Sequence, residues 1–489
     1  MAQYLEVMGN LRFPLDCTYP GCPQNSDQKK EQSIMWESLG FRESPYNTNP
    51  LKPRKEDLDL LVGRDAEATE FCTQLDTAPN GILVLSGAPG VGKTSFFNIQ
   101  QYLLENGIAA FGPKILAARQ LCPVQPNDEV RSLALRALDS LYRSVSAWCT
   151  LNKKSPPKET KKIGKWLVGT GSSGFDIGIN ILGTGGNFGR SVDLPKMADA
   201  SFEAIGDAIA AITAEAISVL DFESVVIALD NLENLEDEQL KTVLISFRDT
   251  LFSISNVWWV LIGQSGLGSL IQALDPRVFE RTTGSGIEIK PIELTELDEA
   301  IAIRVTKFHK SKGGNPPLTT ETHRSLFEAS YGEMRFVFKY SNSICTKFVE
   351  KTRASVLSNL PVKKSATAKD TKTVIDRALN EAIGSLMIGK QLSHQQAAGY
   401  LEQIVESELK GLNLKQKEKS VLELIGARGQ ARASDFKDYG LRSMQDFSSN
   451  YLTKLFVQNL LVRQQQGRAV NYRLRGIAQL AYTFGLLKA

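Results

Sequence analysis

The sequence predicts an α/β fold with a parallel sheet, followed by a helical lid and a C-terminal domain of helices and one hairpin. Short apolar runs at 82–85, 225–229 and 257–262 have the length of buried strands. The first run leads into glycine and the second into Asp230, at the strand end where open α/β sheets bind ligands. A chain of 489 residues exceeds what one core usually supports, so we expect two or three domains.

The composition and the first residues argue against a zinc-binding motif and a secretory signal. An apolar fraction of 42% and a charged fraction of 23% are ordinary for globular chains. Six scattered cysteines and three histidines do not form a zinc motif, so we expect reduced thiols, as in a cytoplasmic protein. The first ten residues lack the basic start and apolar run of a secretory signal.

One uncharged segment, residues 250–274, is long enough to cross a bilayer. Its continuous apolar run covers only 257–262, however, and polar residues and glycines interrupt the remainder. We therefore expect a buried strand, a turn and a helix here, and no membrane association.

The residues after the first strand fit the pattern GxxxxGK[ST], and apolar residues at helical spacing follow them until Gly107. In this strand, loop and helix context, a glycine-rich loop wraps phosphate with its backbone N–H groups. We expect the loop to bind ATP or ADP, with Lys93 reaching the β- and γ-phosphate oxygens of ATP and the Thr94 hydroxyl binding Mg²⁺. A purely structural turn is the alternative. The predicted nucleotide-binding residues are Gly87, Pro89, Gly90, Val91, Gly92, Lys93, Thr94 and Ser95.

The second strand places Asp230 at its C-terminal end, where a carboxylate would be the second protein ligand of Mg²⁺. The next residue is Asn231, and Glu233 follows two places later. Glu233 is the nearest carboxylate able to orient or deprotonate an attacking water. The alternative for Glu233 is an ordinary solvated residue at the start of a helix.

A second glycine pattern, GxGxxG at 169–174, precedes an alternating apolar pattern that is typical of a strand and not of a helix. We interpret Gly169–Gly189 as a glycine-bounded β-ribbon, an insert near 163–190 with no readable function. The lysine-rich run Asn152–Lys165 before it is expected to be a solvated linker, with a DNA-contacting loop as the alternative.

In this order the motifs resemble AAA+ ATPases of the origin-recognition initiator branch, which lie close to the STAND signalling ATPases. The resemblance covers roughly Ser44 to the C-terminus, and it includes "SPYNTNPL" at 44–51 and "LVGRDAEATEF" at 61–71, which look like adenine-side elements. It implies an AAA+-like parallel sheet in the core. The roles it implies are a nucleotide contact for Arg64, a position near the γ-phosphate for Gln264, an arginine finger at Arg277 or Arg281, and a sensor arginine at Arg335.

The sequence departs from the family pattern at Asn231, where hydrolytically active AAA+ members usually carry Glu. This departure implies slow hydrolysis and favours a switch that holds its nucleotide.

The predicted domain order follows from the motifs and from a polar linker at 363–372. We expect an N-terminal extension (1–43), an ATPase core (44–292), a helical lid (293–362), a linker with helices (363–410) and a winged helix (411–489).

The predicted winged helix rests on an order of helices at 415–427, 434–439 and 445–459 and two short strands around Gly467. Phe447, Tyr451, Leu452, Leu455 and Phe456 are expected to form the buried stripe of the long helix. From Gly411 onward, 13 Lys and Arg stand against 5 Asp and Glu, a net charge of +8 on a chain of net charge +3. Such a basic module suits a polyanion, although many winged helices bind only proteins. The candidate DNA-binding residues are Arg442, Asn450, Lys454, Arg463 and Arg468.

The sequence thus predicts a slow, Mg²⁺-dependent ATPase that works as a molecular switch. It would bind double-stranded DNA, form a homo-oligomer and act on a protein partner, in an initiation, transposition or phage-defence role. The alternative is a STAND-like signalling ATPase whose winged helix contacts protein, although the sequence shows no periodicity of 20 to 50 residues.

Overall fold

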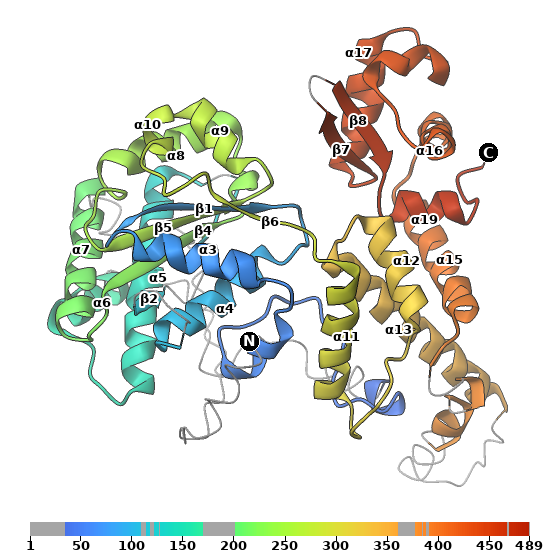
Figure 1. The fold of residues 1–489 in the computed structure, drawn as a ribbon, viewed down its shortest axis with the longest axis horizontal. Coiled ribbons are helices and arrows are strands. Elements are labelled where there is room, and N and C mark those ends of the chain that lie inside the picture. Colours follow the sequence, from blue (N-terminus) through green and yellow to red (C-terminus); the bar gives the residue numbers. More distant parts are fainter. Residues whose placement is uncertain are drawn as a thin grey trace.

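The computed structural model describes residues 35–108, 114–117, 122–126, 128–169, 201–359, 377–383, 385–387, 391–466 and 469–488. An α/β domain is joined to a helical lid, and a C-terminal module of helices and one hairpin lies against the lid (Figure 1). Residues 170–190 of the expected ribbon and the expected linker at 363–372 lie outside the described residues.

The sheet of the α/β domain has six strands, all in parallel pairs, in the order β2-β4-β5-β1-β6 with β3 beside β4. The order places β5 between β1, which leads into the glycine-rich loop, and β4, which ends at Asp230. The carboxyl ends of these three strands therefore meet at one edge of the sheet. The strands are β1 Gly81–Gly87, β2 Ile115–Ala117, β3 Cys122–Pro123, β4 Ser224–Asp230, β5 Val257–Gly263 and β6 Ile287–Ile289.

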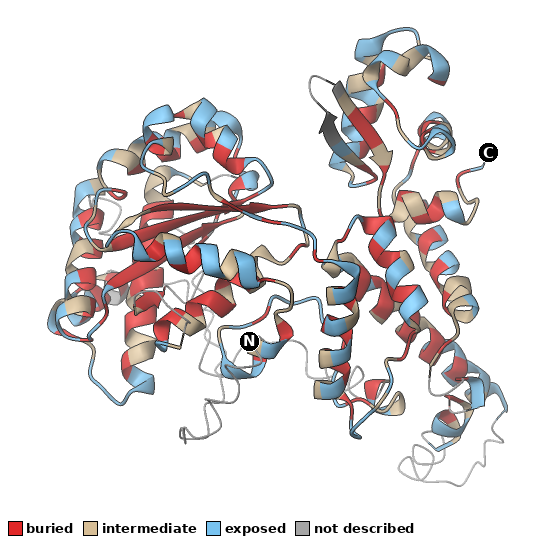
Figure 2. Cartoon of the chain, viewed as in Figure 1, coloured by how far each residue is buried: buried red, intermediate tan, exposed pale blue. Residues whose placement is uncertain are grey.

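Successive residues of the central strands pack into different cores, because side chains alternate across a sheet. Trp258 of β5 packs with the helices of one face, whereas Trp259 packs with those of the other. Both faces are covered, so the strands are buried along their length (Figure 2). One face carries α3 Asp65–Asp76 and α4 Lys93–Glu105, and the other carries α5 Val130–Leu151, α6 Lys158–Gly169, α7 Phe202–Ser218, α8 Asp237–Asp249 and α9 Leu267–Leu274.

The uncharged segment 250–274 forms the buried strand β5, a turn and helix α9, as the sequence predicts. Among the described residues, no helix has the length and apolar character needed to cross a membrane.

The lysine-rich run before the predicted ribbon is not a linker over its whole length. Its second half belongs to α6, and Ile163 and Leu167 of this helix are buried against the core. The two buried side chains are four positions apart, one helical turn, while Lys161, Lys162 and Lys165 face solvent. The predicted insert therefore does not begin at residue 163, because 163–169 are helical.

The lid consists of α11 Leu294–Phe308, α12 Thr320–Ser330, α13 Met334–Asn359 and α15 His394–Gly411. Residues before the α/β domain belong to this core as well, since Trp36, Phe41 and Tyr46 pack with lid side chains. The backbone also pairs Phe41 with His309 at the end of α11.

The C-terminal module contains α16 Gln416–Arg428, the 3-10 helix η4 Ala433–Tyr439, α17 Met444–Asp446, the π-helix η5 Phe447–Thr453, α18 Lys454–Val457, strands β7 Leu461–Gln466 and β8 Ala469–Leu474, and α19 Ile477–Thr483. The two strands are antiparallel. Buried side chains of this module and of the lid form one continuous core. Helix α19 contacts α12, α15 and α16, so it joins the lid to the module.

The buried stripe predicted for the long helix holds for Phe447, Leu452 and Leu455, but Phe456 is exposed. The prediction assumed the α-helical period, whereas 447–453 form a π-helix. The wider turns of a π-helix rotate the residues that follow, which moves Phe456 away from the core.

Candidate nucleotide-binding site

The glycine-rich loop runs from the end of β1 to the start of α4. Gly90 and Gly92 have φ angles of +77° and +103°, a left-handed region that side chains with a Cβ rarely adopt. Helix α4 begins at Lys93, directly after Gly92, so its first N–H groups and its positive dipole end face the loop. The loop has the backbone geometry of a phosphate-binding cradle.

Lys93 lies inside the loop. Its Nζ donates hydrogen bonds to the carbonyl oxygens of Gly87 at 2.8 Å and Ala88 at 3.2 Å. Burial lowers the pKa of Lys93, while the nearby carboxylates of Glu233 and Asp230 oppose this shift. A phosphate would offer the ammonium stronger, charged acceptors than these carbonyls.

Thr94 and Asp230 meet at the strand edge of the same pocket, where the Thr94 hydroxyl donates to Asp230 Oδ2 at 3.1 Å. Asp230 is buried, which raises the pKa of its carboxyl, while hydrogen bonds from Thr94 and from the Asn231 N–H lower it. A hydroxyl and a carboxylate oxygen side by side are the hard ligands that Mg²⁺ accepts. The pair fits the predicted Mg²⁺ role.

The chain turns sharply after Asp230. Asn231 has a φ of +64°, which asparagine tolerates better than most residues, and the 3-10 helix η3 Leu232–Asn234 follows. This turn brings Glu233 to the pocket that Lys93 and Asp230 line. A carboxylate is thus available at the phosphate end, two residues after Asn231.

Two other predicted residues contact the loop from outside. The Arg64 guanidinium is buried and donates to Val91 O and Glu67 Oε1, both at 3.0 Å, so it fixes the backbone of the loop. Ser95 Oγ accepts a hydrogen bond from Leu51 N at 3.1 Å and anchors the segment before the α/β domain to α4. Both residues border the pocket.

The lid supplies Arg335. It lies in the first turn of α13, its N–H is 3.5 Å from Gly90 O, and its side chain borders the pocket near Lys93. Gln264, in contrast, is exposed at the end of β5 and does not line the pocket. The structure therefore brings Arg335 to the predicted site but leaves Gln264 outside it.

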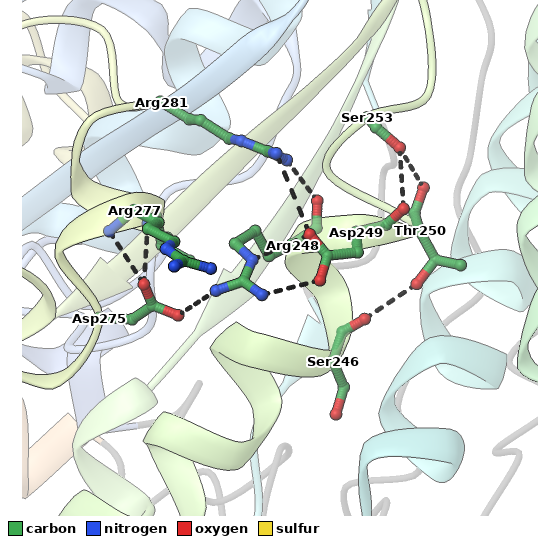
Figure 3. Close-up of polar contacts among 9 residues, drawn as sticks. Ser246, Arg248, Asp249, Thr250, Ser253, Asp275, Arg277 and Arg281 are labelled. Atoms are coloured by element: carbon green, nitrogen blue, oxygen red, sulfur yellow. Dashed lines mark hydrogen bonds and ion pairs between the residues drawn. The ribbon is translucent and has the colours of Figure 1, made fainter.

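The two candidate finger arginines have different surroundings (Figure 3). Arg281 donates to Arg248 O at 2.5 Å and lies 4.0 Å from Asp249, whereas Arg248 forms an ion pair with Asp275 at 2.9 Å. Arg277, in the short helix α10 Pro276–Phe279, is exposed. Its guanidinium has no hydrogen bond or ion pair with a residue that the structure describes. Neither arginine lines the pocket of its own chain.

Sequence reasoning missed two lid residues, Arg304 in the wall of this pocket and Glu333 against the glycine-rich loop. Arg304 is 8% exposed, and its guanidinium carbon lies 4.6 Å from the centre of the Phe338 ring. Glu333 packs against the tip of the loop, because a Cβ at Gly90 would lie 2.3 Å from Glu333 Cγ. In the sequence, the only sign of a role for Arg304 is that a charged residue lies in the otherwise apolar stripe of α11. No feature of the sequence points to Glu333 before the fold is known.

The candidate DNA-binding residues lie on the C-terminal module, but not all are free. Asn450 donates to Asp446 at 2.8 Å, and Lys454 forms an ion pair with the buried Glu418 at 2.5 Å. Arg442 and Arg463 are exposed, and their side chains make no hydrogen bond or ion pair within the described part of the chain. Arg468 lies outside the described residues.

Fold and loop together define a P-loop NTPase domain. Residues 64–264 match the KAP family P-loop domain. A comparison with curated proteins finds no match.

Solved structures similar to the chain include the Aeropyrum pernix ORC2 protein in ADPNP-ADP complexes, at 13% identity and a TM-score of 0.44 over 92% of this chain and 98% of that one. The Aeropyrum pernix ORC1 protein in complex with DNA has 13% identity and a TM-score of 0.39, over 88% and 98% of the two chains. A variant of Thermotoga maritima RuvB has 12% identity and a TM-score of 0.33, over 89% and 99%. Similarity at this level does not extend to a function.

Proposed function

We propose that this protein is a slowly hydrolysing, Mg²⁺-dependent ATPase whose nucleotide state controls how its C-terminal module binds double-stranded DNA. The loop, Lys93 and the Thr94–Asp230 pair provide the phosphate and Mg²⁺ end of the site. Bound Mg²⁺ would neutralise phosphate charge, and Lys93 and Arg335 would hold the phosphate oxygens.

One observation supports a switch in particular, namely the double contact of Glu333. Its side chain packs on Gly90 at the tip of the loop, and its Oε2 accepts a hydrogen bond from Arg475 at 2.7 Å. Arg475 lies between β8 and α19, and the next residue, Gly476, donates to Ala329 O of α12 at 2.7 Å. Glu333 therefore joins the loop directly to the C-terminal module, and a movement of the loop on binding phosphate would reach the module through this side chain.

Slow hydrolysis is expected because Asn231 occupies the position, directly after Asp230, where a catalytic glutamate is expected. The amide of Asn231 cannot accept a proton from water, and Glu233 would have to orient the attacking water from the η3 turn. Such a site would keep ATP bound for a long time before hydrolysing it, as a switch requires.

Self-association would complete the site with an arginine from a neighbouring subunit. We assign this role to Arg277, because its guanidinium is exposed and makes no hydrogen bond or ion pair with a described residue, whereas Arg281 is bound to Arg248 O in its own chain. An arginine that lies outside its own pocket can act on a phosphate only across an interface.

DNA binding is proposed from the net charge of +8 on residues 411–489 and from the exposed Arg442 and Arg463. The order of helices followed by an antiparallel hairpin suits a winged helix, and the hairpin would lie along the phosphate backbone. The alternative is a STAND-like signalling ATPase whose module contacts a protein. The acidic Asp446 beside Asn450 favours this alternative at that part of the surface.

Equilibrium titration with ATP and ADP, combined with mobility shifts of duplex DNA, tests the proposal. Wild type should bind both nucleotides, and its duplex affinity should change with nucleotide. Lys93→Ala should lose ATP binding and keep its fold, because the hydrogen bonds of the ammonium to described residues go to two loop carbonyls and not to the core. Equal ATP affinity in both proteins would refute the phosphate site, and a wild type that binds ATP but not duplex would favour the signalling alternative.

A further inference from the structure

Within the described part of the chain, the buried Arg304 guanidinium has no hydrogen-bond acceptor. It is 8% exposed, its Nε is buried without a partner, and no described residue accepts a hydrogen bond from its other nitrogens. A buried N–H donor of a charged group that lacks an acceptor loses its hydration without compensation, which is unfavourable. Such a group indicates a missing partner.

The nearest acid does not supply that partner. Asp57 is close enough to raise the pKa of Arg304, but its oxygens accept hydrogen bonds from Lys52 N and Arg54 Nε, both at 2.8 Å. Burial lowers the pKa of Arg304 to about 10, so the side chain stays protonated at neutral pH. The Phe338 ring, 4.6 Å away, holds the guanidinium by a cation–π contact and offers no acceptor in its plane.

The position of Arg304 in the pocket identifies which part of a nucleotide it would meet. The loop, Thr94 and Asp230 define the phosphate end. The remaining wall comes from the segment before the α/β domain and from the lid, and it is mainly apolar, as a flat base requires. This wall includes Leu51, Leu60, Ile292, Ala300, Arg304 and Phe338.

We propose that Arg304 donates a hydrogen bond to a ring nitrogen of the purine base and is a specificity-determining residue of this pocket. The inference rests on the proposed nucleotide-binding function. Adenine presents N1, N3 and N7 as acceptors in the plane of the ring, which is what an unpaired N–H group needs. This hydrogen bond would form only when nucleotide is bound.

The test is a set of equilibrium titrations of the full chain with ATP, with 1-deaza-, 3-deaza- and 7-deaza-ATP, and with inorganic tripolyphosphate. One deaza analogue should bind wild type about 10-fold or more weakly than ATP, as expected for a hydrogen bond from a charged group. Arg304→Met should lose about the same factor for ATP, yet bind that analogue and tripolyphosphate as wild type does. Arg324→Met, which removes an exposed arginine of α12 paired with Asp298, is the matched control and should change none of these affinities.

A second measurement separates recognition from a structural role. Because Met removes an unpaired buried charge and keeps most of the volume, Arg304→Met should leave the melting temperature of the nucleotide-free protein unchanged or higher. A lower melting temperature with unchanged ATP affinity would make Arg304 structural and overturn the inference alone. Equal losses for ATP and tripolyphosphate, or sensitivity to 2′-deoxy-ATP instead of any deaza analogue, would also overturn it. A wild type that binds none of these ligands would overturn the proposed function itself.

Discussion

Glu333→Gln removes one charge from the contact that joins the P-loop to the C-terminal module while keeping the size of the side chain. The ion pair it weakens is short, 2.7 Å between Glu333 Oε2 and Arg475 Nη2, and its side chains are 20% and 11% exposed. Hydrogen bonds to charged groups contribute about 1.5–3 kcal/mol, whereas exposed ion pairs contribute about 0–1 kcal/mol. At these exposures we expect a loss of about 2 kcal/mol, or roughly 30-fold in a local opening equilibrium.

Amide hydrogen exchange measures that opening directly. Peptides covering β8 and α19 should exchange roughly 30-fold faster in Glu333→Gln when opening is limited by this contact. In wild type, ATP should change protection in the same peptides, and in the variant this effect should shrink. Asp298→Asn weakens a comparable lid pair, Asp298 with Arg324, whose side chains are 32% and 47% exposed and do not reach the loop. It should leave α19 unchanged.

Two results would refute this reasoning. Exchange in α19 that is identical in wild type and Glu333→Gln would show that the ion pair does not hold the module. An undiminished ATP effect on α19 in the variant would show that the coupling runs through other contacts, such as the hydrogen bond between Gly476 N and Ala329 O.

Four further predictions concern hydrolysis, assembly, DNA binding and acid stability. ATP hydrolysis without a partner should be on the order of one turnover per minute or less, against ~10 per second for a typical enzyme, and Glu233→Gln should lower it again in a phosphate-release assay; an unchanged rate would remove Glu233 from the mechanism. Mixing Lys93→Ala with Arg277→Ala should restore part of the activity, because one interface of the mixed oligomer keeps both groups; mixed oligomers without any activity would contradict the assignment of Arg277. Arg463→Gln should reduce the log–log salt slope of duplex binding by about one, and an unaltered slope would place Arg463 away from phosphate. Burial lowers the pKa of His323 to about 4, below the value near 6.5 in an unfolded chain. Its contribution to the free energy of unfolding is therefore complete above about pH 6.5 and is lost as pH falls towards 4, by about 3 kcal/mol in total. Melting curves of His323→Gln should depend less on acid pH than those of wild type, and an equal dependence would exclude this histidine as the cause.

The sequence predicts the parts of the site that local chemistry determines. A glycine-rich loop after an apolar strand needs left-handed backbone at particular positions, and Gly90 and Gly92 have it. Asp230 likewise follows from one apolar run that ends in a carboxylate. Strand β5 and helix α9 could be predicted because polar residues and glycines interrupt the uncharged segment 250–274, so it cannot form one membrane helix.

The remaining features depend on contacts between distant residues. The place of β5 between β1 and β4 is set by packing on two faces, which no local pattern encodes. Glu333 and Arg475 are 142 positions apart in sequence, so their pairing cannot be read from either segment. The π-helical turn that exposes Phe456 replaces the α-helical period on which the prediction relied.

The shared core also changes how the C-terminal module can be tested. The predicted boundary at 411 falls on the last residue of α15, and α19 packs on both the lid and the module. Removal of 411–489 would expose apolar lid side chains in addition to removing the module. Point variants therefore test DNA binding more cleanly than truncation does.

The most direct test of a nucleotide-controlled DNA switch is the duplex affinity of the full chain with ATP, with ADP and without nucleotide, at one fixed salt concentration. We expect wild type to bind duplex in all three conditions with different affinities, and Lys93→Ala to have one affinity whatever nucleotide is added. Equal wild-type affinities across the three conditions, with ATP binding shown in the same samples, would contradict the switch.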